Sequence, residues 1–531
     1  MDTIVIKDRI LQSSKKSSTL FKNEVEKPFV QIMLELLQRK DGSETMMIDA
    51  TTQQVLSNDE FLRNSLQAAN ILMRRGWGRT KGEVIHIVLP NCIFYHSLVF
   101  AIWLLGGVPS LADPSLRLPI LKKQVEDNQA VLIICQESLV DSMTSVISSK
   151  TKIMAIESIF CSPSSTTRME SLDYFLKGLQ NAMNDTMVIF WSSGTTGKPK
   201  GIAHTRRFLQ MSLAESQFPR PSTILQTTCF YHTGGFFLAL DGAIFNSFKI
   251  VFLNANNSIT AEMLQESIHN HKAAILICGS HHAVQLARSN PMPQFDLNSL
   301  KIVGPMGAAV HSQITKELKL VFPSMMEAIL GYYGMTEVGT ISTSMTPTSL
   351  GSLAPGVQVK IVDDNNALLK TFETGEIMAK TPTLMNGYLN CPEDNERFFN
   401  DPHNEGFVRT GDLGYYDAEG VLYYQGRIKE LIKYQNCHIS PKEIEEVALT
   451  HSGVADVGIY GRPDPIVQEL VCAVVVKSPA GAKLTEDQVA NYINERVDSF
   501  KQLRGGVKFV ESLENFRNPQ GKLIRAKLQS L

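Results

Sequence analysis

The sequence predicts an α/β protein with a large N-terminal domain, built of packed α/β subdomains and a β-rich subdomain, and a small α+β C-terminal domain. Three observations support this prediction: uninterrupted apolar runs in the N-terminal half, a change to short strands after about residue 350, and a mixed unit in the last hundred residues. A chain of 531 residues is long enough to bury more than one core. We expect the two domains to be residues 1–426 and 427–531.

Five runs in the N-terminal part are apolar at nearly every position. They are Val84–Pro90, Ala130–Cys135, Met187–Trp191, Lys249–Leu253 and Ala273–Cys278. Runs that do not alternate are typical of strands covered on both faces, and the intervals between them are long enough for crossover helices. The runs therefore predict strands between layers of helices.

The segment Ile93–Ala112 has nearly the length of a membrane span. However, polar His96, the Gly106-Gly107 pair and Pro109 interrupt it. We therefore expect this segment to contain a buried helix of the N-terminal domain.

The pattern of apolar residues and turns changes in the C-terminal third. The turn signals Asp363-Asp364 and Glu419-Gly420 separate short runs, which predicts antiparallel strands. Farther on, we expect strands near residues 455–461 and 470–476 and a helix over Glu486–Phe500. The apolar face of that helix consists of Val489, Tyr492, Ile493, Val497 and Phe500.

The composition and the termini exclude several classes of protein. The formal net charge of −2 gives no support to nucleic-acid binding. The eight cysteines form no CxxC pair, which argues against a zinc site or a secreted disulfide scaffold. The N-terminus lacks a long apolar signal region, and the final Gln-Ser-Leu differs from a peroxisomal signal in its first two residues. We expect an intracellular protein, cytoplasmic or peroxisomal, that is a monomer or a weak homo-oligomer.

A glycine-rich stretch, SSGTTGKPKG, directly follows the run Met187–Trp191. Its glycines permit close approach of backbone amides to phosphate, while hydroxyl and lysine side chains add donors and charge. The spacing is not that of a Walker A loop, because Pro199 follows Gly197-Lys198. Taken alone, the stretch is more typical of a flexible, solvated surface loop. The residues expected to contact phosphate are Ser192, Ser193, Gly194, Thr195, Thr196, Gly197 and Lys200.

Four further motifs follow this loop along the chain. The five motifs span Ser192–Gly201, Gly331–Glu337, Arg409–Tyr416, Gly426–Lys433 and Asn518–Lys522. Together they resemble those of the adenylate-forming superfamily, which includes acyl-CoA synthetases, peptide-synthetase adenylation domains and beetle luciferases. The resemblance is greatest to the 4-coumarate-CoA ligase and luciferase-like branch. It implies that a carboxylate attacks the ATP α-phosphate to give acyl-AMP, and that coenzyme A then displaces AMP.

The resemblance also implies roles for individual residues in a nucleotide site. Glu337 would bind the Mg²⁺ that bridges the phosphates, since hard cations prefer carboxylate oxygens, and Thr336 would donate to the α-phosphate. Asp412 would accept hydrogen bonds from both ribose hydroxyls. Tyr333 would stack on the adenine, beside a loop that matches Gly307-Ala308-Ala309, and Gly334 would also belong to the nucleotide site.

The C-terminal domain is implied to be mobile. Lys522 would bridge the substrate carboxylate and the α-phosphate during adenylation only, and Lys433 would serve the second half-reaction. Rotation at a hinge that includes Lys429 would exchange the two faces, with Arg427 also near the ribose. The sequence has Asn436 at a position where the family usually has glycine. A side chain there would narrow the path of the coenzyme A thiol, so it concerns the second half-reaction and not adenylation.

The acyl pocket is implied to begin at His232, which would gate or position the carboxylate; a buried structural histidine is the alternative. Gly234 and Gly235 leave room for a substantial acyl group. We therefore expect an ATP-, Mg²⁺- and coenzyme A-dependent ligase for a small-molecule acid, either fatty or aryl-alkenoic. A luciferase-like oxidative adenylase and a catalytically silent acyl- or nucleotide-binding homologue are the alternatives.

Overall fold

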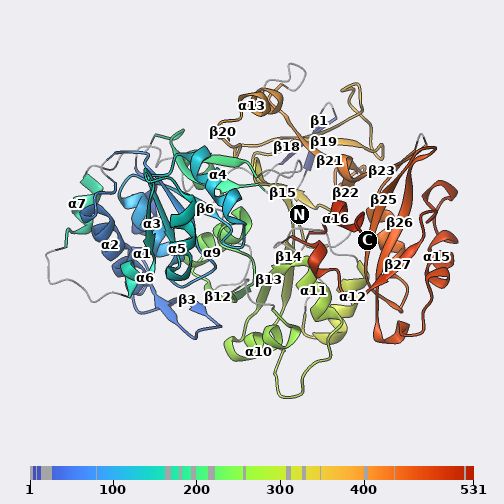
Figure 1. Ribbon diagram of the computed structural model, residues 1–531, viewed down its shortest axis with the longest axis horizontal. Helices are drawn as coiled ribbons and strands as arrows, with labels where there is room; N and C mark the ends of the chain where they lie inside the picture. The colour runs from blue at the N-terminus through green and yellow to red at the C-terminus, as the bar shows by residue number, and fades with distance from the viewer. Residues whose placement is uncertain are drawn as a thin grey trace.

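The structure is a computed structural model that shows a mixed α/β architecture with a large N-terminal and a small C-terminal domain, as the sequence predicts (Figure 1). It describes residues 4–7, 9–13, 27–78, 80–161, 169–177, 179, 182–192, 199–212, 222–254, 259–306, 312–325, 330–346, 349–399, 405–435, 437–518 and 522–531. Helices and sheets of the N-terminal part lie on the left and centre of the view, and the C-terminal sheet lies on the right.

The first sheet has seven strands in the order β20-β10-β9-β6-β5-β7-β8. The strands are β5 (Val84–Val88), β6 (Val108–Ala112), β7 (Leu132–Cys135), β8 (Lys152–Ala155), β9 (Thr186–Trp191), β10 (Gly201–Thr205) and β20 (Gly387–Tyr388). Strands β5 to β9 pair in parallel, and β10 returns antiparallel to β9. Its helices are α2 (Asn58–Arg74), α3 (Tyr95–Leu104), α4 (Leu118–Asn128), α5 (Glu137–Val146), α6 (Glu157–Phe160) and α7 (Leu172–Lys177).

Helix α3 confirms the expectation for the long apolar segment. All ten of its residues are buried, and β6 follows it within the first sheet. Across the described ranges of the chain, no helix is long and apolar enough to cross a membrane.

The second sheet has six strands in the order β14-β13-β11-β12-β3-β4, of which only β4 is antiparallel to its neighbour. The strands are β3 (Thr45–Asp49), β4 (Val55–Ser57), β11 (Thr223–Gln226), β12 (Lys249–Phe252), β13 (Ile275–Gly279) and β14 (Ile302–Met306). The helices are α1 (Phe29–Gln38), α9 (Thr233–Leu240), α10 (Ala261–His271), α11 (Ser280–Ala287) and α12 (Ser312–Val321), and α9 continues as a π-helix, η2 (Asp241–Phe245). Helix α8 (Arg206–Ser212) instead contacts β9 and β10 of the first sheet. All five predicted apolar runs are strands of these two sheets, which share one apolar core.

The β-rich part contains an antiparallel sheet in the order β1-β2-β18-β19-β21-β22 and a small sheet of β15 to β17. The strands are β1 (Ile4–Lys7), β2 (Ile10–Ser13), β15 (Gly331–Met335), β16 (Gly339–Ser344), β17 (Ser352–Leu353), β18 (Gln358–Val362), β19 (Gly375–Lys380), β21 (Val408–Tyr416) and β22 (Leu422–Arg427). Helix α13 (Pro392–Phe399) lies beside them. The expected antiparallel strands are therefore present, whereas the sequence did not reveal the N-terminal hairpin.

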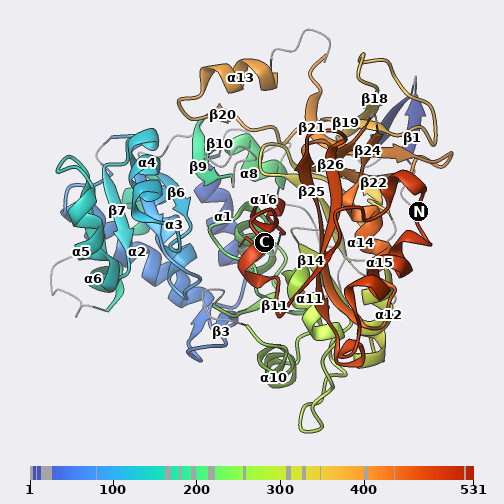
Figure 2. The same ribbon diagram turned by 45° about the vertical axis from the view of Figure 1, so that its right-hand side comes forward.

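The C-terminal sheet follows η3 (Ile428–Glu430), a 3₁₀ turn (Figure 2). Its strands are β23 (Ile432–Tyr434), β24 (Cys437–Ile439), β25 (Val454–Asp464), β26 (Gln468–Lys477) and β27 (Val507–Val510). The accompanying helices are α14 (Pro441–Leu449), α15 (Glu486–Asn494) and α16 (Arg525–Leu528), with 3₁₀ turns η4 (Pro479–Gly481), η5 (Ser499–Lys501) and η6 (Glu514–Phe516).

The prediction of a helix as far as Phe500 is wrong at its C-terminal end. Helix α15 stops at Asn494, whose side-chain oxygen accepts a hydrogen bond from the Leu503 N–H at 2.7 Å. The chain then turns through η5, yet Val497 and Phe500 still pack on the same core. The apolar spacing therefore continues beyond the helix, because these two side chains still pack on the core.

Candidate active site

The carboxyl ends of the two parallel sheets meet. Asn91, after β5, accepts a hydrogen bond from the Phe230 N–H at 2.7 Å and donates to the Thr228 carbonyl at 3.1 Å, and both partners follow β11. Asp113, after β6, is hydrogen-bonded to the hydroxyl of Tyr231. Such edges, where loops from several strands converge, are where α/β proteins bind ligands.

Strands β9 and β10 form the base of the glycine-rich loop. The Ser192 N–H donates to the Lys200 carbonyl at 3.0 Å, and Gly201 pairs with Trp191. The Lys200 ammonium lies 2.8 Å from the carboxylate of Asp394 in α13 and 5.1 Å from the centre of the Tyr388 ring. The predicted phosphate contacts Ser193, Gly194, Thr195, Thr196 and Gly197 lie outside the described residues.

Asp412 is the centre of a buried polar group. It lies on β21, directly opposite Arg427 on β22, and is 4% exposed. Its Oδ1 accepts from Nε of Arg427 at 2.9 Å, and its Oδ2 accepts from the Tyr333 hydroxyl at 3.1 Å. Burial raises the pKa of Asp412, while the charges of Arg427 and, to a smaller extent, Lys522 act in the opposite direction.

Glu337 lies in the turn between β15 and β16. The hydroxyl of Tyr388 donates to its Oε1 at 2.9 Å. Burial raises the pKa of Glu337, and the positive charges of Arg427 and Lys200 partly offset this rise. Glu337 therefore belongs to the same electrostatic environment as the Asp412 group.

The β15–β16 hairpin requires a glycine at Gly334. A Cβ atom there would lie 2.2 Å from the carbonyl oxygen of Gly339 on the opposite strand. This close approach sets the path of the backbone that presents Tyr333 before Gly334 and Thr336 after it.

Lys522 comes to this group from the C-terminal domain. Asn518 and Lys522 exchange hydrogen bonds: the Asn518 N–H donates to the Lys522 carbonyl at 2.9 Å, and the Lys522 N–H donates to Oδ1 of Asn518 at 2.8 Å. The Lys522 ammonium lies 2.6 Å from Oε1 of Glu430, and its charge offsets a small part of the rise that burial causes in the pKa of Asp412.

His232 is the residue before the first turn of α9. Burial lowers its pKa to about 4, although the charge of Asp113 acts against this, so the imidazole is neutral at pH 7. A Cβ at Gly235 would lie 2.1 Å from the Cys229 carbonyl oxygen, and one at Gly234 would lie 2.5 Å from Cε of Met306. The start of α9 is thus held against both the preceding loop and the end of β14.

The remaining predicted residues lie elsewhere or outside the described ranges. Lys429 is in η3, and Lys433 is an exposed residue of β23 whose N–H donates to Glu469 at 2.7 Å. Gly307, Ala308 and Asn436 are not among the described residues.

Sequence reasoning assigned no role to Tyr388, Asp394 or Glu430. Glu430 lies within the motif Gly426–Lys433, and this position was the signal that could have identified it, whereas Tyr388 and Asp394 lie outside the five motifs.

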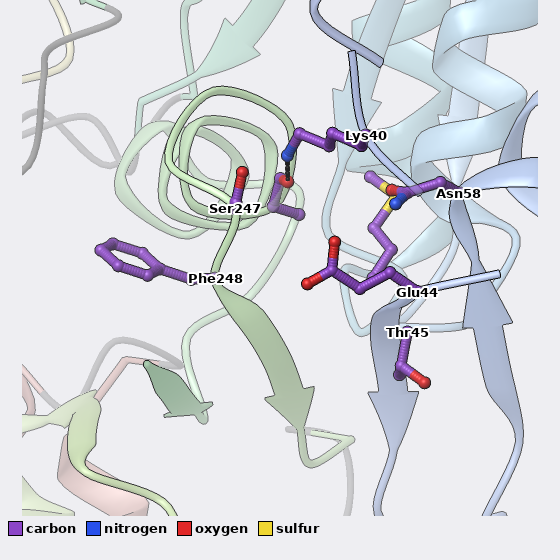
Figure 3. Close-up of a pocket in the computed structure, with 8 residues that line it drawn as sticks. Lys40, Glu44, Thr45, Asn58, Ser247 and Phe248 are labelled. Carbon is purple, nitrogen blue, oxygen red and sulfur yellow. Dashed lines mark hydrogen bonds between the residues drawn. The ribbon is translucent and has the colours of Figure 1, made fainter. Parts of the chain in front are cut away.

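A separate small cavity lies between the end of α1, β3 and the segment after η2 (Figure 3). Lys40, Glu44, Asn58 and Ser247 are among its lining residues, and the Lys40 ammonium donates to the Ala243 carbonyl at 2.6 Å. Its volume of about 10 Å³ is roughly that needed for one water molecule. No residue that lines it belongs to the Asp412 group.

Two family models cover most of the chain. The AMP-binding enzyme model matches residues 36–389, and the AMP-binding enzyme C-terminal domain model matches residues 443–521. The chain belongs to the adenylate-forming superfamily. Membership confirms the resemblance seen in the five motifs.

Relatives of this adenylate-forming enzyme include both branches expected from the sequence. 4-Coumarate–CoA ligase 4 of Arabidopsis thaliana is 27% identical over 92% of this chain and 88% of its own length. Luciferin 4-monooxygenase of Nipponoluciola cruciata is 31% identical, over 61% of this chain and 60% of its own. The o-succinylbenzoate CoA synthetase of Bacillus subtilis, solved with an acyl-adenylate intermediate, superimposes with a TM-score of 0.77 at 24% identity, over 95% of this chain and 98% of its own. The protein is an enzyme of the acid–thiol ligase class.

Proposed function

We propose that the protein activates a fatty or aryl-alkenoic acid with ATP, as acyl-AMP, and transfers the acyl group to coenzyme A. The observation that carries the proposal is the convergence of Tyr333, Glu337, Asp412, Arg427 and Lys522 on one place, although the chain separates the first from the last by almost two hundred residues. Two carboxylates, an aromatic ring and two cations are groups suited to bind the ribose, base and phosphates of a nucleotide.

Asp412 is suited to bind the ribose. A carboxylate offers about four lone-pair positions, of which Arg427 and Tyr333 occupy two. The other two can accept the ribose hydroxyls, and the adenine then stacks near Tyr333. The glycine-rich loop keeps its predicted role in contacting the leaving phosphates.

Glu337 fits a site for Mg²⁺. Among the described residues, no cluster of three or more acidic, histidine or cysteine side chains could enclose a metal ion. Mg²⁺ usually binds through one or two carboxylates together with substrate phosphates, and a single half-buried glutamate meets this requirement. The cation would neutralise charge on the phosphates, while Thr336 and Lys200 supply donors beside it.

Lys522 is the proposed catalytic group of the first half-reaction. Its ammonium bridges the attacking carboxylate and the α-phosphate, where negative charge develops. Rotation at Lys429 then removes Lys522 and brings Lys433 to the acyl-AMP for the second half-reaction. The sequence has Asn436 where the family usually has glycine, so the rate of this second half-reaction tests whether that glycine is needed.

The acid would enter beside His232. A neutral imidazole at the start of α9 can donate a hydrogen bond to the carboxylate without holding it as an ion pair. The acyl chain would then run along the face of α9 that carries Gly234. The relatives named for aryl-alkenoic acids support an acid of this kind, and the fatty-acid alternative has the same head group.

The test is a panel of acids with Mg-ATP and coenzyme A. Octanoic, palmitic, cinnamic and 4-coumaric acids cover both classes, and mass spectrometry identifies acyl-AMP and acyl-CoA. Formation of acyl-CoA and AMP supports the proposal. Accumulation of acyl-AMP without thioester would refute the coenzyme A step, and the absence of any adenylate across a wider panel would refute the whole proposal.

The 31% identity to a luciferin 4-monooxygenase favours a second candidate, an oxidative adenylase. Light emission from the protein with luciferin, Mg-ATP and oxygen would show that the enzyme also oxidises the adenylate, and its absence would refute this second candidate. Both candidates share the adenylation step, so only the fate of the adenylate differs.

A further inference from the structure

Lys522 is held by a carboxylate in the segment that joins the β-rich sheet to the C-terminal sheet. Its ammonium lies 2.6 Å from Oε1 of Glu430, the last residue of η3. The second oxygen of Glu430 accepts a hydrogen bond from Nε of Arg525 at 3.2 Å. One carboxylate therefore binds two cations of the same C-terminal segment.

Arg525 fixes the position of that carboxylate. The guanidinium also donates to Glu445 on α14 and to the carbonyl of Ile459 on β25, so it is tied to three elements. The side chains of Arg525 and Glu445 are 19% and 17% exposed. Burial acts to raise the pKa of Glu430, but Lys522 and Arg525 hold it below its usual value. Glu430 is therefore ionised at neutral pH and held in place.

We propose that Glu430 is the positioning residue for the adenylation step: it binds one N–H of the Lys522 ammonium and directs the other two toward the acid carboxylate and the α-phosphate. An ammonium has three donors, so the contact with Glu430 is compatible with both substrate contacts. A lysine side chain otherwise has wide rotational freedom, and the ion pair restricts it. The inference rests on the proposed function, because it assigns Lys522 to adenylation.

The effect of removing the charge follows from these contacts. Glu430→Gln keeps the shape of the side chain and lowers the strength of its hydrogen bond to Lys522. We expect kcat for acyl-AMP formation to fall about tenfold or more, the change typical of losing a charged hydrogen-bond partner. The KM for ATP stays near its original value, since Asp412 and Tyr333 are untouched. Thioester formation from supplied acyl-AMP also persists, because that step does not use Lys522.

Glu445→Gln is the matched control. It removes a carboxylate from Arg525, as Glu430→Gln does, but makes no contact with Lys522. The experiment compares wild type, both variants, Lys522→Ala and the double variant Lys522→Ala/Glu430→Gln. It measures pyrophosphate release with the best acid of the panel and thioester formation from the matching acyl-AMP, which also reports whether each variant is folded.

The expected result is a selective loss of adenylation in Glu430→Gln, little change in Glu445→Gln, and a double variant no slower than Lys522→Ala, since residues that act as one unit are not additive. Equal loss of both half-reactions in Glu430→Gln, or a loss matched by Glu445→Gln, would overturn the inference and leave Glu430 a structural residue. Unchanged adenylation in Lys522→Ala would instead refute the proposed role of Lys522 itself.

Discussion

Replacing Asp412 by asparagine tests the nucleotide site most directly. The carboxylate is buried and already accepts hydrogen bonds from Arg427 and Tyr333, so the proposed ribose contacts would use its remaining lone pairs. Asparagine has the same shape, but it carries no charge and has a single acceptor oxygen. It cannot serve both protein donors and both ribose hydroxyls.

The magnitude follows from the hydrogen bonds that are lost. A hydrogen bond to a charged group contributes about 1.5–3 kcal/mol, so the loss of one or two ribose contacts is worth roughly 3 kcal/mol in ATP binding. This corresponds to an increase of about a hundredfold in the KM for ATP. The fold also loses an ion pair; because the Arg427 side chain is 30% exposed, we expect a stability cost of only about 1–3 kcal/mol.

The assay is pyrophosphate exchange over a range of ATP concentrations, with thermal unfolding measured in parallel. Asp417→Asn is the control, because Asp417 likewise accepts a hydrogen bond from a tyrosine, Tyr423, at 2.9 Å on the same β21–β22 hairpin, yet lies outside the Asp412 group. We expect its KM for ATP to match the wild type. A folded Asp412→Asn enzyme with an unchanged KM for ATP would refute the ribose assignment.

Three further predictions use other contacts of the site. Lys522→Ala should lose about 3–4 kcal/mol of transition-state stabilisation in adenylation but still convert supplied acyl-AMP to thioester, whereas Lys433→Ala should show the reverse; equal effects in both assays would contradict the two-step assignment. Burial raises the pKa of Glu337 and the hydrogen bond from Tyr388 lowers it, so adenylation should decline as acidification protonates Glu337. Tyr388→Phe removes that hydrogen bond and should move the inflection of the pH–rate profile to higher pH. Superimposable profiles of the variant and the wild type would count against a metal-binding role for Glu337. Gly235→Ala should destabilise the fold by about 1–3 kcal/mol, since its Cβ would lie 2.1 Å from a carbonyl oxygen, while Gly331→Ala, with 3.7 Å to the nearest atom, should change the melting temperature little.

The buried strands were predictable because their physics is local. A strand covered on both faces is apolar at every position, and this pattern survives whichever strands become its neighbours. The pairing of β2 with β18 has no such local mark, since it joins residues near 11 and near 359. The helix α15 was predicted too long for a related reason: periodicity records which side chains pack on the core, and Val497 packs on it, partly buried, without being helical.

The site residues likewise differ in whether the sequence could predict them. Residues expected to touch substrate lie in motifs with distinctive glycine, tyrosine and acidic spacing, so their types could be read from the sequence. Tyr388, Asp394 and Glu430 act on those residues across the fold, through contacts of 2.6 to 2.9 Å that no spacing encodes. In the sequence, a glutamate that forms an ion pair with a lysine cannot be distinguished from any other acidic residue in a turn.

The order of residues at the junction has a mechanical consequence. Arg427 precedes the proposed hinge at Lys429 and is paired with Asp412 on the β-rich sheet, whereas Glu430 follows it and is paired with Lys522 and Arg525. Rotation at Lys429 would therefore leave the first ion pair with the β-rich sheet, to which β22 belongs, and carry the second with the C-terminal sheet. In that case neither of these partly buried ion pairs would have to break during the cycle, and the motion would avoid the cost of separating their charges. Lys522 would then return to the adenylation site already held by Glu430, with only its contacts to substrate left to form.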